Sequence, residues 1–240
     1  MKIFSRMKSK KIYQFSEAFE LLLTRLNKNN ININLIKNKI VLDMGCGNGR
    51  YSYALKNFGA KKVFAIDGDI KDNIKMKTVE YQNGSILKLP YKNGSFDFVF
   101  CNGKLSHTKN WKTGIKEAYR VLKKNGVFWL SVYGKGKIWK YADKISKKLN
   151  EKDRENFQKY LVYRDWEPGK IYFLVDSFFS KDRVYFTKKQ IKNELLKQGF
   201  TNIKFLERGI KKDLNEKIFR NPKLKKIYGE GEIRLIATKS

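Results

Sequence analysis

A short glycine-rich segment at residues 41–51 constrains this chain more than any other. Its sequence, VLDMGCGNGRY, is an apolar run that leads directly into three alternate glycines. Such a run predicts a buried strand followed by a tight turn and a helix. Gly45, Gly47 and Gly49 tolerate positive φ and carry no Cβ, so backbone amides can approach a ligand closely. The segment therefore predicts a turn that binds an adenosine-bearing cofactor.

The spacing of these glycines is G-x-G-x-G, which differs from the dinucleotide fingerprint G-x-G-x-x-G. The third glycine of that fingerprint seats a helix whose N-terminus holds a pyrophosphate. Asp43 would repel a pyrophosphate and suits a ligand with an ammonium group. A second apolar run, residues 62–67, ends in Asp67, where α/β sites place the acceptor for ribose hydroxyls. These features favour S-adenosylmethionine; the alternative is a strand-to-helix turn without a ligand.

The remaining pattern alternates strands and helices. Apolar residues at helical spacing from Ile12 to Leu26 predict a leading helix. Asn110 is expected to begin a helix that Asn125 and Gly126 end. Strands are predicted at residues 39–44, 62–66, 79–82, 96–101 and 127–132. This order favours a parallel, doubly wound α/β sheet.

The C-terminal part predicts one more helix and a hairpin. Thr187 and Gln190 form a capping-box pattern before Ile191, Leu195 and Leu196, and Gly199 closes that helix. Residues 201–206 and 231–238 then predict two antiparallel strands around a basic excursion.

Five segments, in order and spacing, resemble the class I S-adenosylmethionine-dependent methyltransferases with a type 11/25-like domain. They are residues 41–51, 66–67, 84–91 (GSILKLPY), 94–100 (GSFDFVF) and 120–126 (RVLKKNG). The resemblance spans residues 38–133. It implies a Rossmann-like, doubly wound, mostly parallel seven-stranded sheet with an antiparallel last strand.

The resemblance also implies roles for individual residues in S-adenosylmethionine binding. Asp43 and the backbone of the glycine turn would hold the methionine moiety, and Asp67 would take the ribose diol. Ser85 and Ile86 would line the adenine pocket, while the end of the fourth strand would lie beside the sulfonium. The implied cofactor-binding residues are Asp43, Gly45, Cys46, Gly47, Gly49, Asp67, Gly68, Ser85, Ile86, Cys101 and Asn102, with Gly103 next to them.

The sequence departs from the family pattern in two places. Many relatives carry an acidic residue where Ser85 stands, so adenine recognition here is expected to use backbone groups or the serine hydroxyl. The interval from Asp67 to Ser85 is short and leaves room only for a clipped or irregular crossover helix.

His107, the single histidine, is the candidate catalytic residue. It follows the fourth strand in NGKLSHT, which resembles the family segment bordering the active site. Its unperturbed pKa suits a general base, although a histidine that caps the next helix is an equal alternative. Tyr13, Tyr133 and Trp139 are candidates for the acceptor pocket, with packing the alternative for each.

Residues 134–186 interrupt the alternation with a lysine-rich, aromatic stretch that predicts one or two helices around residues 138–160. An insertion after the fifth strand lies where it can cover the acceptor site, so we interpret it as a substrate lid; a satellite apolar core is the alternative. We therefore expect the chain to form a single domain. Its parts are a helical extension (1–37), the cofactor-binding core (38–133), the lid (134–186) and a C-terminal helix with a strand hairpin (187–240).

The formal net charge of +30 raises the question of a nucleic-acid partner. Lysines outnumber arginines by 43 to 10, and arginine is the residue suited to bidentate phosphate and base contacts. The basic N-terminus and residues 204–226 are therefore interpreted first as solvated surfaces and second as a groove for RNA.

Further classes are excluded by what the sequence lacks. Two cysteines, Cys46 and Cys101, give no disulfide framework and favour the reducing cytoplasm. No apolar window is long enough for a membrane span, and no Cys or His cluster predicts a metal site. The fourth strand is not followed by Asn-Pro-Pro-Tyr, which disfavours methylation of base amino groups.

Three functional hypotheses follow. The first is a methyltransferase that acts on an O, N or C acceptor of a small molecule by in-line displacement. The second is a tRNA or rRNA methyltransferase of the wobble-uridine type that uses the basic surface, because the glycine turn and later segments also resemble those enzymes. The third is a non-catalytic protein that binds S-adenosylmethionine.

Overall fold

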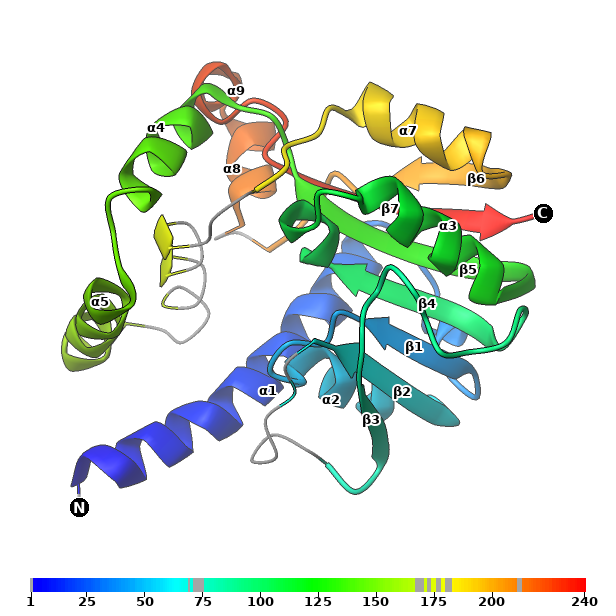
Figure 1. Ribbon diagram of the computed structural model, residues 1–240, viewed down its shortest axis with the longest axis horizontal. Helices are drawn as coiled ribbons and strands as arrows, with labels where there is room; N and C mark the ends of the chain where they lie inside the picture. Colours follow the sequence, from blue (N-terminus) through cyan, green and yellow to red (C-terminus); the bar gives the residue numbers. More distant parts are fainter. Residues whose placement is uncertain are drawn as a thin grey trace.

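The protein is described by a computed structural model covering residues 2–68, 70, 76–166, 171, 174–175, 178–179, 183–210 and 213–240, with the backbone alone in residues 2–14 and at Leu214. In this described part, seven strands form one sheet with helices on both faces (Figure 1). The strands are β1 (Ile40–Met44), β2 (Lys62–Asp67), β3 (Val79–Asn83), β4 (Phe96–Asn102), β5 (Leu122–Tyr133), β6 (Phe200–Phe205) and β7 (Glu232–Lys239). The main helices are α1 (Lys2–Lys28), α2 (Arg50–Asn57), α3 (Trp111–Val121), α4 (Lys137–Ser146), α5 (Glu151–Tyr163), α7 (Lys188–Lys197), α8 (Leu214–Arg220) and α9 (Pro222–Tyr228).

The strand order is β3-β2-β1-β4-β5-β7-β6. Strands β1 to β5 pair in parallel, and β7 runs antiparallel to both of its neighbours. The predicted Rossmann-like sheet with an antiparallel last strand is thereby confirmed. The carboxyl ends of β1, β2, β4 and β5 meet at one edge, where ligands bind in sheets of this kind.

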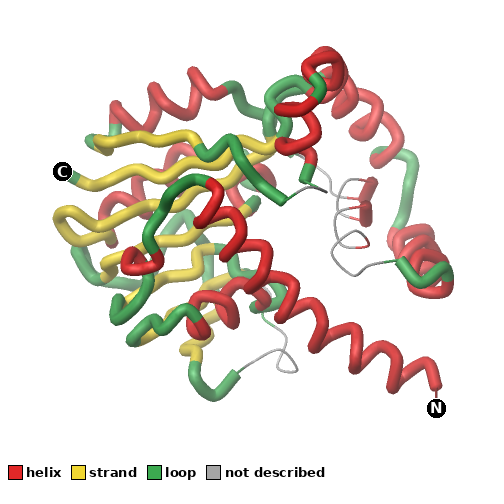
Figure 2. The backbone as a smooth tube through the Cα atoms, turned by 180° about the vertical axis from the view of Figure 1, so that it is seen from behind, coloured by secondary structure: helices red, strands yellow, loops and turns green. Residues whose placement is uncertain are grey.

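Two apolar layers cover the sheet, and strand alternation decides which residue enters which layer. Leu42 of β1 packs with α3 and α7, whereas its neighbour Val41 packs with α1 and α2. We call the side covered by α1 and α2 the α1 face (Figure 2). Asp43 lies on the α1 face by the same alternation, at the carboxyl end of β1.

The prediction that Asn125 and Gly126 end a helix is wrong. Helix α3 ends at Val121, and Leu122 already pairs with Phe96 as the first residue of β5. In this pairing Leu122 is fully buried, which contributes favourable apolar burial to the strand. Asn110 does precede α3, but its side chain makes no capping hydrogen bond.

The predictions for the C-terminal helix and strand pair are confirmed. The capping box at the start of α7 is present, since the backbone N–H of Gln190 donates to Thr187 Oγ1 at 3.2 Å and the N–H of Thr187 donates to Gln190 Oε1 at 3.0 Å. Strands β6 and β7 pair antiparallel around α8 and α9, as expected. Ile191 and Leu195 form the inner face of α7, whereas Leu196 is 51% exposed.

The segment at residues 134–186 leaves and rejoins the sheet at the carboxyl end of β5, where Gly134 and Phe186 form a β-bridge. Helices α4 and α5 lie where the sequence predicted one or two helices around residues 138–160. The predicted irregular crossover between β2 and β3 falls mainly on residues 69 and 71–75, which lie outside the described residues. None of the helices described is long and apolar enough to cross a membrane.

Candidate functional site

The glycine turn joins the end of β1 to the start of α2. Gly45, Gly47 and Gly49 have φ of +90°, +52° and +76°, the conformation that glycine adopts without strain. The backbone N–H groups of Gly45 and Cys46 donate to the carbonyl of Ile66 at 2.8 and 3.1 Å. The turn is therefore fastened to the neighbouring strand β2 and held in a fixed shape.

Asp67, at the carboxyl end of β2, closes one side of this turn. Its Oδ2 accepts a hydrogen bond from the N–H of Gly47 at 3.0 Å, and its Oδ1 accepts one from the N–H of Gly68 at 2.7 Å. The carbonyl of Asp67 accepts from the N–H of Gly84 at 2.9 Å. The carboxylate is thus aimed across the turn.

Asp43 closes the other side and is only 2% exposed. The hydroxyl of Ser52 donates to Asp43 Oδ2 at 2.6 Å. Burial, with a smaller contribution from the charge of Asp67, raises the pKa of Asp43 to about 7, against the opposing hydrogen bond from Ser52. A buried carboxyl that titrates near neutrality gains strongly from a cationic ligand.

Lys104 lies across the turn and was not predicted as a site residue. It belongs to a short 3-10 helix, η3 (Lys104–His107), that follows β4, and its Nζ forms an ion pair with Asp67 Oδ1 at 2.6 Å. A Cβ added to Gly45 would come within 2.4 Å of Lys104 Cβ. The missing side chain of Gly45 therefore accommodates Lys104 in this structure. In the sequence, Lys104 could have been noticed only as a basic residue directly after Gly103, at the end of a predicted strand in the same parallel sheet as the strands of Asp43 and Asp67.

The predicted adenine-side residues differ in their surroundings. Ser85 is exposed, and its Oγ accepts a hydrogen bond from the N–H of Leu87 at 3.1 Å, which forms a local turn. Ile86 is 3% exposed and packs in the apolar layer under α3 and α7. Of the pair, only the Ser85 loop is accessible to a ligand.

Asn102, Cys101 and Cys46 complete the predicted set. Asn102 ends β4 on the α1 face, and its Oδ1 is buried without a hydrogen-bond partner among the described residues. A buried oxygen without a hydrogen-bond donor is suited to a donor group on a ligand. Both cysteines are free and buried; burial raises the pKa of Cys101 to about 12 and that of Cys46 further, so both thiols are neutral. Cys101 points into the opposite apolar layer, away from Asp43.

His107 lies at the end of η3, beside the end of β5. Its ring meets Tyr133 edge-on, with centroids 5.4 Å apart and an interplanar angle of 86°. The backbone N–H of Tyr133 donates to Ser106 Oγ at 2.8 Å, which fixes this loop against β5. The side chain of Tyr13, another predicted acceptor-site residue, lies outside the described residues.

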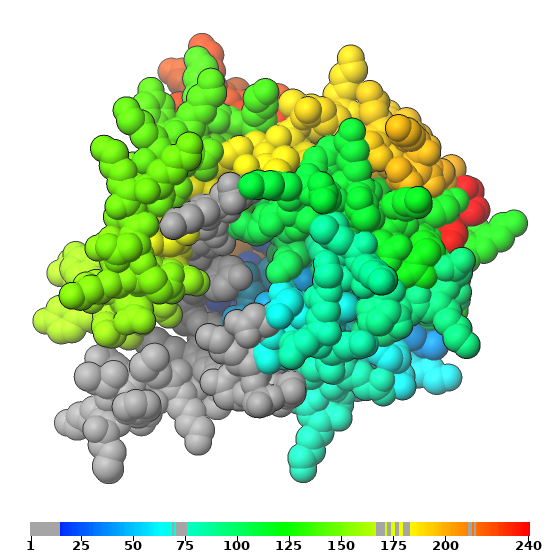
Figure 3. Space-filling model, viewed as in Figure 1, coloured from blue at the N-terminus to red at the C-terminus, as the bar shows by residue number. Residues whose placement is uncertain are grey.

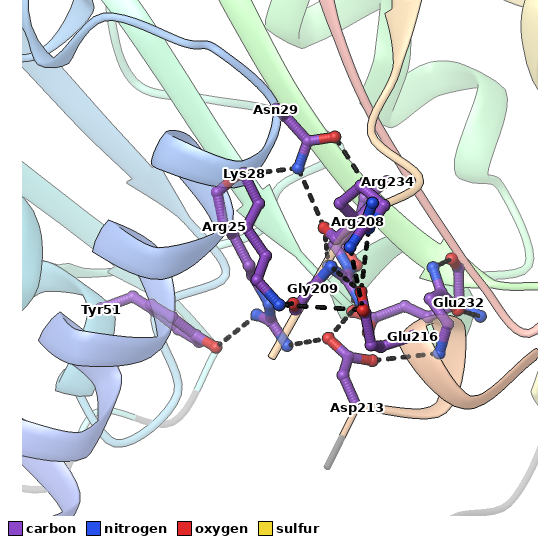
Figure 4. Close-up of polar contacts among 12 residues, drawn as sticks. Arg25, Lys28, Asn29, Tyr51, Arg208, Gly209, Asp213, Glu216, Glu232 and Arg234 are labelled. Carbon is purple, nitrogen blue, oxygen red and sulfur yellow. Dashed lines mark hydrogen bonds and ion pairs between the residues drawn. The ribbon is translucent and has the colours of Figure 1, made fainter. Parts of the chain in front are cut away.

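A buried polar network, absent from the sequence predictions, borders the same edge of the sheet (Figure 4). Arg25 of α1 donates to the hydroxyl of Tyr51 at 3.3 Å and to Asp213 Oδ2 at 3.1 Å. Asp213 also pairs with Arg234, whose Nε lies 3.2 Å from Glu232 Oε2. The network fastens α1 to the segment before α8 and to β7. No sequence prediction concerns Arg25 or Arg234, because nothing local in the sequence marks them as buried.

A doubly wound sheet whose first strand runs into an acid-flanked glycine turn defines a class I S-adenosylmethionine-dependent methyltransferase domain. Residues 42–130 match the family model described as "Methyltransferase domain". This part of the chain is such a domain, and S-adenosylmethionine is its expected cofactor.

Two bacterial relatives match less than half of this chain. A tRNA U34 carboxymethyltransferase from Campylobacter jejuni is 30% identical over 106 residues, which are 41% of this chain and 36% of that protein. The corresponding protein from Campylobacter lari is 28% identical over 103 residues, 40% of this chain and 35% of that protein. The matches thus span little more than a third of each relative.

Solved structures share the fold over the whole chain. An S-adenosylmethionine-dependent methyltransferase from Thermotoga maritima has a TM-score of 0.57 at 18% identity and covers 100% of both chains. A chain from the complex between the Haloferax volcanii Trm112 methyltransferase activator and a methyltransferase has a TM-score of 0.58 at 13% identity, covering 98% of this chain and 95% of that one. Identities this low establish the fold alone.

Proposed function

We propose that this protein transfers a methyl group from S-adenosylmethionine to a small-molecule acceptor bound at the carboxyl ends of β4 and β5. The observation that carries the proposal is the pair of acids on opposite sides of the glycine turn. The buried Asp43 suits the ammonium of the methionine moiety, and Asp67 suits the ribose hydroxyls once Lys104 moves aside. The unmet Oδ1 of Asn102 lies on the same face of the sheet and is available to a further donor.

Bound in this turn, S-adenosylmethionine supplies an electrophilic methyl group on a sulfonium. The chain's own residues then have two tasks: to align an acceptor with that methyl group and to remove the acceptor's proton. In-line displacement depends mainly on alignment. His107, from the loop after β4, is the residue we assign as general base for the acceptor proton.

The location of residues 134–186 supports this assignment of the acceptor site. The segment begins and ends at the carboxyl end of β5, and the N–H of Val184 donates to the carbonyl of Ser106 at 2.8 Å, beside His107. In the space-filling view, blue atoms of the N-terminal part are visible in a recess beside cyan and green atoms near the centre of the molecule (Figure 3). We therefore assign this segment as the cover of the acceptor site.

A tRNA acceptor is the second candidate, because the two Campylobacter relatives described above are named tRNA U34 carboxymethyltransferases. Their similarity covers about two fifths of this chain and little more than a third of each relative, so it says little about the acceptor. A cytoplasmic reaction fits both candidates and the two free cysteines.

The test is to incubate the purified protein with methyl-labelled S-adenosylmethionine and a host-cell extract, and then to separate RNA from organic-extractable small molecules. Label in the small-molecule fraction supports the first candidate, and label that ribonuclease releases supports the second. Calorimetric binding of S-adenosylmethionine without transfer to any fraction would support a non-catalytic binding protein. His107→Ala should lower turnover and leave cofactor affinity unchanged, while loss of both together would contradict the general-base assignment.

A further inference from the structure

We propose that Tyr133, Trp139 and Tyr185 form one wall of the acceptor site and that the acceptor is a planar aromatic ring. The inference rests on the proposed methyl transfer and adds the chemical class of its substrate. We call these three side chains the aromatic wall.

The three rings come from separate segments that the backbone fixes at the same edge of the sheet. Tyr133 ends β5, Trp139 lies in α4, and Tyr185 lies in the strand-like return of the insertion. The N–H of Phe186 donates to the carbonyl of Tyr133 at 2.9 Å, which sets the return segment beside the end of β5. The edge-on contact between Tyr133 and His107 brings the wall to the candidate base.

The rings share nearly one orientation. Trp139 and Tyr185 are 6.0 Å apart with an interplanar angle of 11°. Tyr133 is 6.5 Å from each of them, at 22° to Trp139 and 33° to Tyr185. At these centroid distances the rings are offset from one another and do not stack face to face. Near-parallel, offset rings of this kind can stack against another planar aromatic ring. Proteins bind aromatic rings and nucleobases by stacking them on aromatic side chains.

The aromatic wall is separate from the apolar clusters that cover the sheet, although Trp139 also contacts Tyr228 of α9, with ring centroids 6.5 Å apart. None of its members belongs to the three buried apolar clusters of the described residues. The insertion has its own apolar cluster, centred on Leu161, Ile171 and Val175, which includes none of these rings. Tyr133 and Tyr185 are only half-buried.

Polar atoms around the wall point to a ligand as well. Trp139 is 9% exposed, yet its indole Nε1 has no hydrogen-bond partner among the described residues. Buried indole N–H groups are normally paired, so a ligand oxygen would satisfy it. The hydroxyl of Tyr185 donates to Asp143 Oδ1 at 2.8 Å, and Arg183 pairs with the same carboxylate at 3.0 Å. These contacts hold the Tyr185 ring in place before any ligand binds.

A planar ring with an oxygen substituent occurs in small phenols and quinols and in the pyrimidine bases of RNA. Both present the same chemistry to the wall. The experiment therefore uses one probe of each kind together with a saturated ring of matched size.

Saturation-transfer difference NMR on the full chain, with S-adenosylhomocysteine present, provides the test. Hydroquinone and uridine are the aromatic probes, and cyclohexane-1,4-diol is the saturated one. We expect saturation transfer to ring protons of at least one aromatic probe and none to the saturated ring. Stronger transfer to hydroquinone would indicate a small-molecule acceptor, and stronger transfer to uridine would indicate a nucleobase. No transfer to either aromatic probe, or equal transfer to cyclohexane-1,4-diol, would overturn the proposal.

Two variants make the test specific to the wall. Trp139→Leu should lower the signal at least fivefold, whereas Trp139→Phe, which keeps a ring, should retain most of it. Tyr141→Leu is the matched control, because Tyr141 lies two residues along the same helix and is 67% exposed. Equal loss in Trp139→Leu and Tyr141→Leu would overturn the proposal. S-adenosylmethionine affinity, measured by calorimetry on the same variants, separates failure of this inference from failure of the proposed function.

Discussion

The charge of Asp43 decides whether the glycine turn can hold an ammonium group. Because burial raises the pKa of Asp43 to about 7, the carboxyl is neutral at pH 5.5 and ionised at pH 8.5. We expect the affinity for S-adenosylmethionine to rise as pH increases through 7, by up to about tenfold per pH unit below that value. Calorimetric titrations across this range check the prediction, and Asp43→Asn should be weaker and nearly independent of pH. The same slope in the variant would assign the effect to another group.

The stability of the cofactor-free protein should change in the opposite direction. A raised pKa means that the folded protein retains a proton that the unfolded chain releases, so stability falls as pH rises from the ordinary aspartate pKa through 7. Asp43→Asn removes this dependence, and its melting temperature relative to the wild type should increase between pH 5 and pH 8. Ser52 can still donate to the asparagine oxygen, which keeps the control conservative.

Lys104 is expected to compete with the cofactor for Asp67. The ion pair is partly exposed, with 33% of the lysine side chain and 9% of the aspartate side chain accessible, so its contribution is modest, on the order of 1 kcal/mol or less. Lys104→Met should therefore bind S-adenosylmethionine up to about fivefold more tightly by calorimetry. Lys61→Met, at an exposed position, is the control. Weaker binding in Lys104→Met would show that the lysine itself holds the cofactor.

At the scale of elements, local sequence signals predicted most of the fold. The glycine turn, the capping box at Thr187 and Gln190, and the strand alternation all act between near neighbours, and the structure contains each of them. The early start of β5 was missed because the pairing of Leu122 with Phe96 overrides the local helical pattern. Tyr133 and Trp139 were predicted as acceptor-site candidates, but Lys104 and Tyr185 were missed because their contacts with Asp67 and Trp139 join residues far apart in the sequence.

The buried network that fastens α1 to β7 should contribute strongly to stability. Arg25→Met removes the donor to Tyr51 and one of the two arginines that contact Asp213. Removing one partner from a buried charge network leaves the others unpaired, and we expect a loss of about 3 kcal/mol in the free energy of unfolding by urea denaturation. Arg154→Met breaks an exposed ion pair with Glu151 and should change stability by less than about 1 kcal/mol. Equal effects would mean that the network is not a stabilising unit.

Acid should weaken the same network. The hydrogen bond from Arg208 holds the pKa of Glu216 at about 2, and Arg234 and Arg25 outweigh the effect of burial on Glu232 and hold its pKa at about 2 as well. Lowered pKa values stabilise the fold above the ordinary glutamate pKa, and this contribution disappears as pH falls toward 2. The acid transition of Glu216→Gln should accordingly be shallower than that of the wild type.

The net charge of the whole molecule favours non-specific RNA binding, so RNA binding by itself would not identify the acceptor. With a formal net charge of +30 and most of its basic residues lysine, the protein's affinity for any RNA should fall steeply with salt, because binding releases condensed counterions. If the acceptor is a small molecule, tRNA and a mixed-sequence RNA of equal length should bind with similar affinity and similar salt dependence in filter-binding assays from 50 to 300 mM salt. Neither RNA should then displace hydroquinone from the aromatic wall. A preference for tRNA that persists at the highest salt, together with displacement of hydroquinone, would contradict the small-molecule proposal and assign the acceptor ring to a tRNA base.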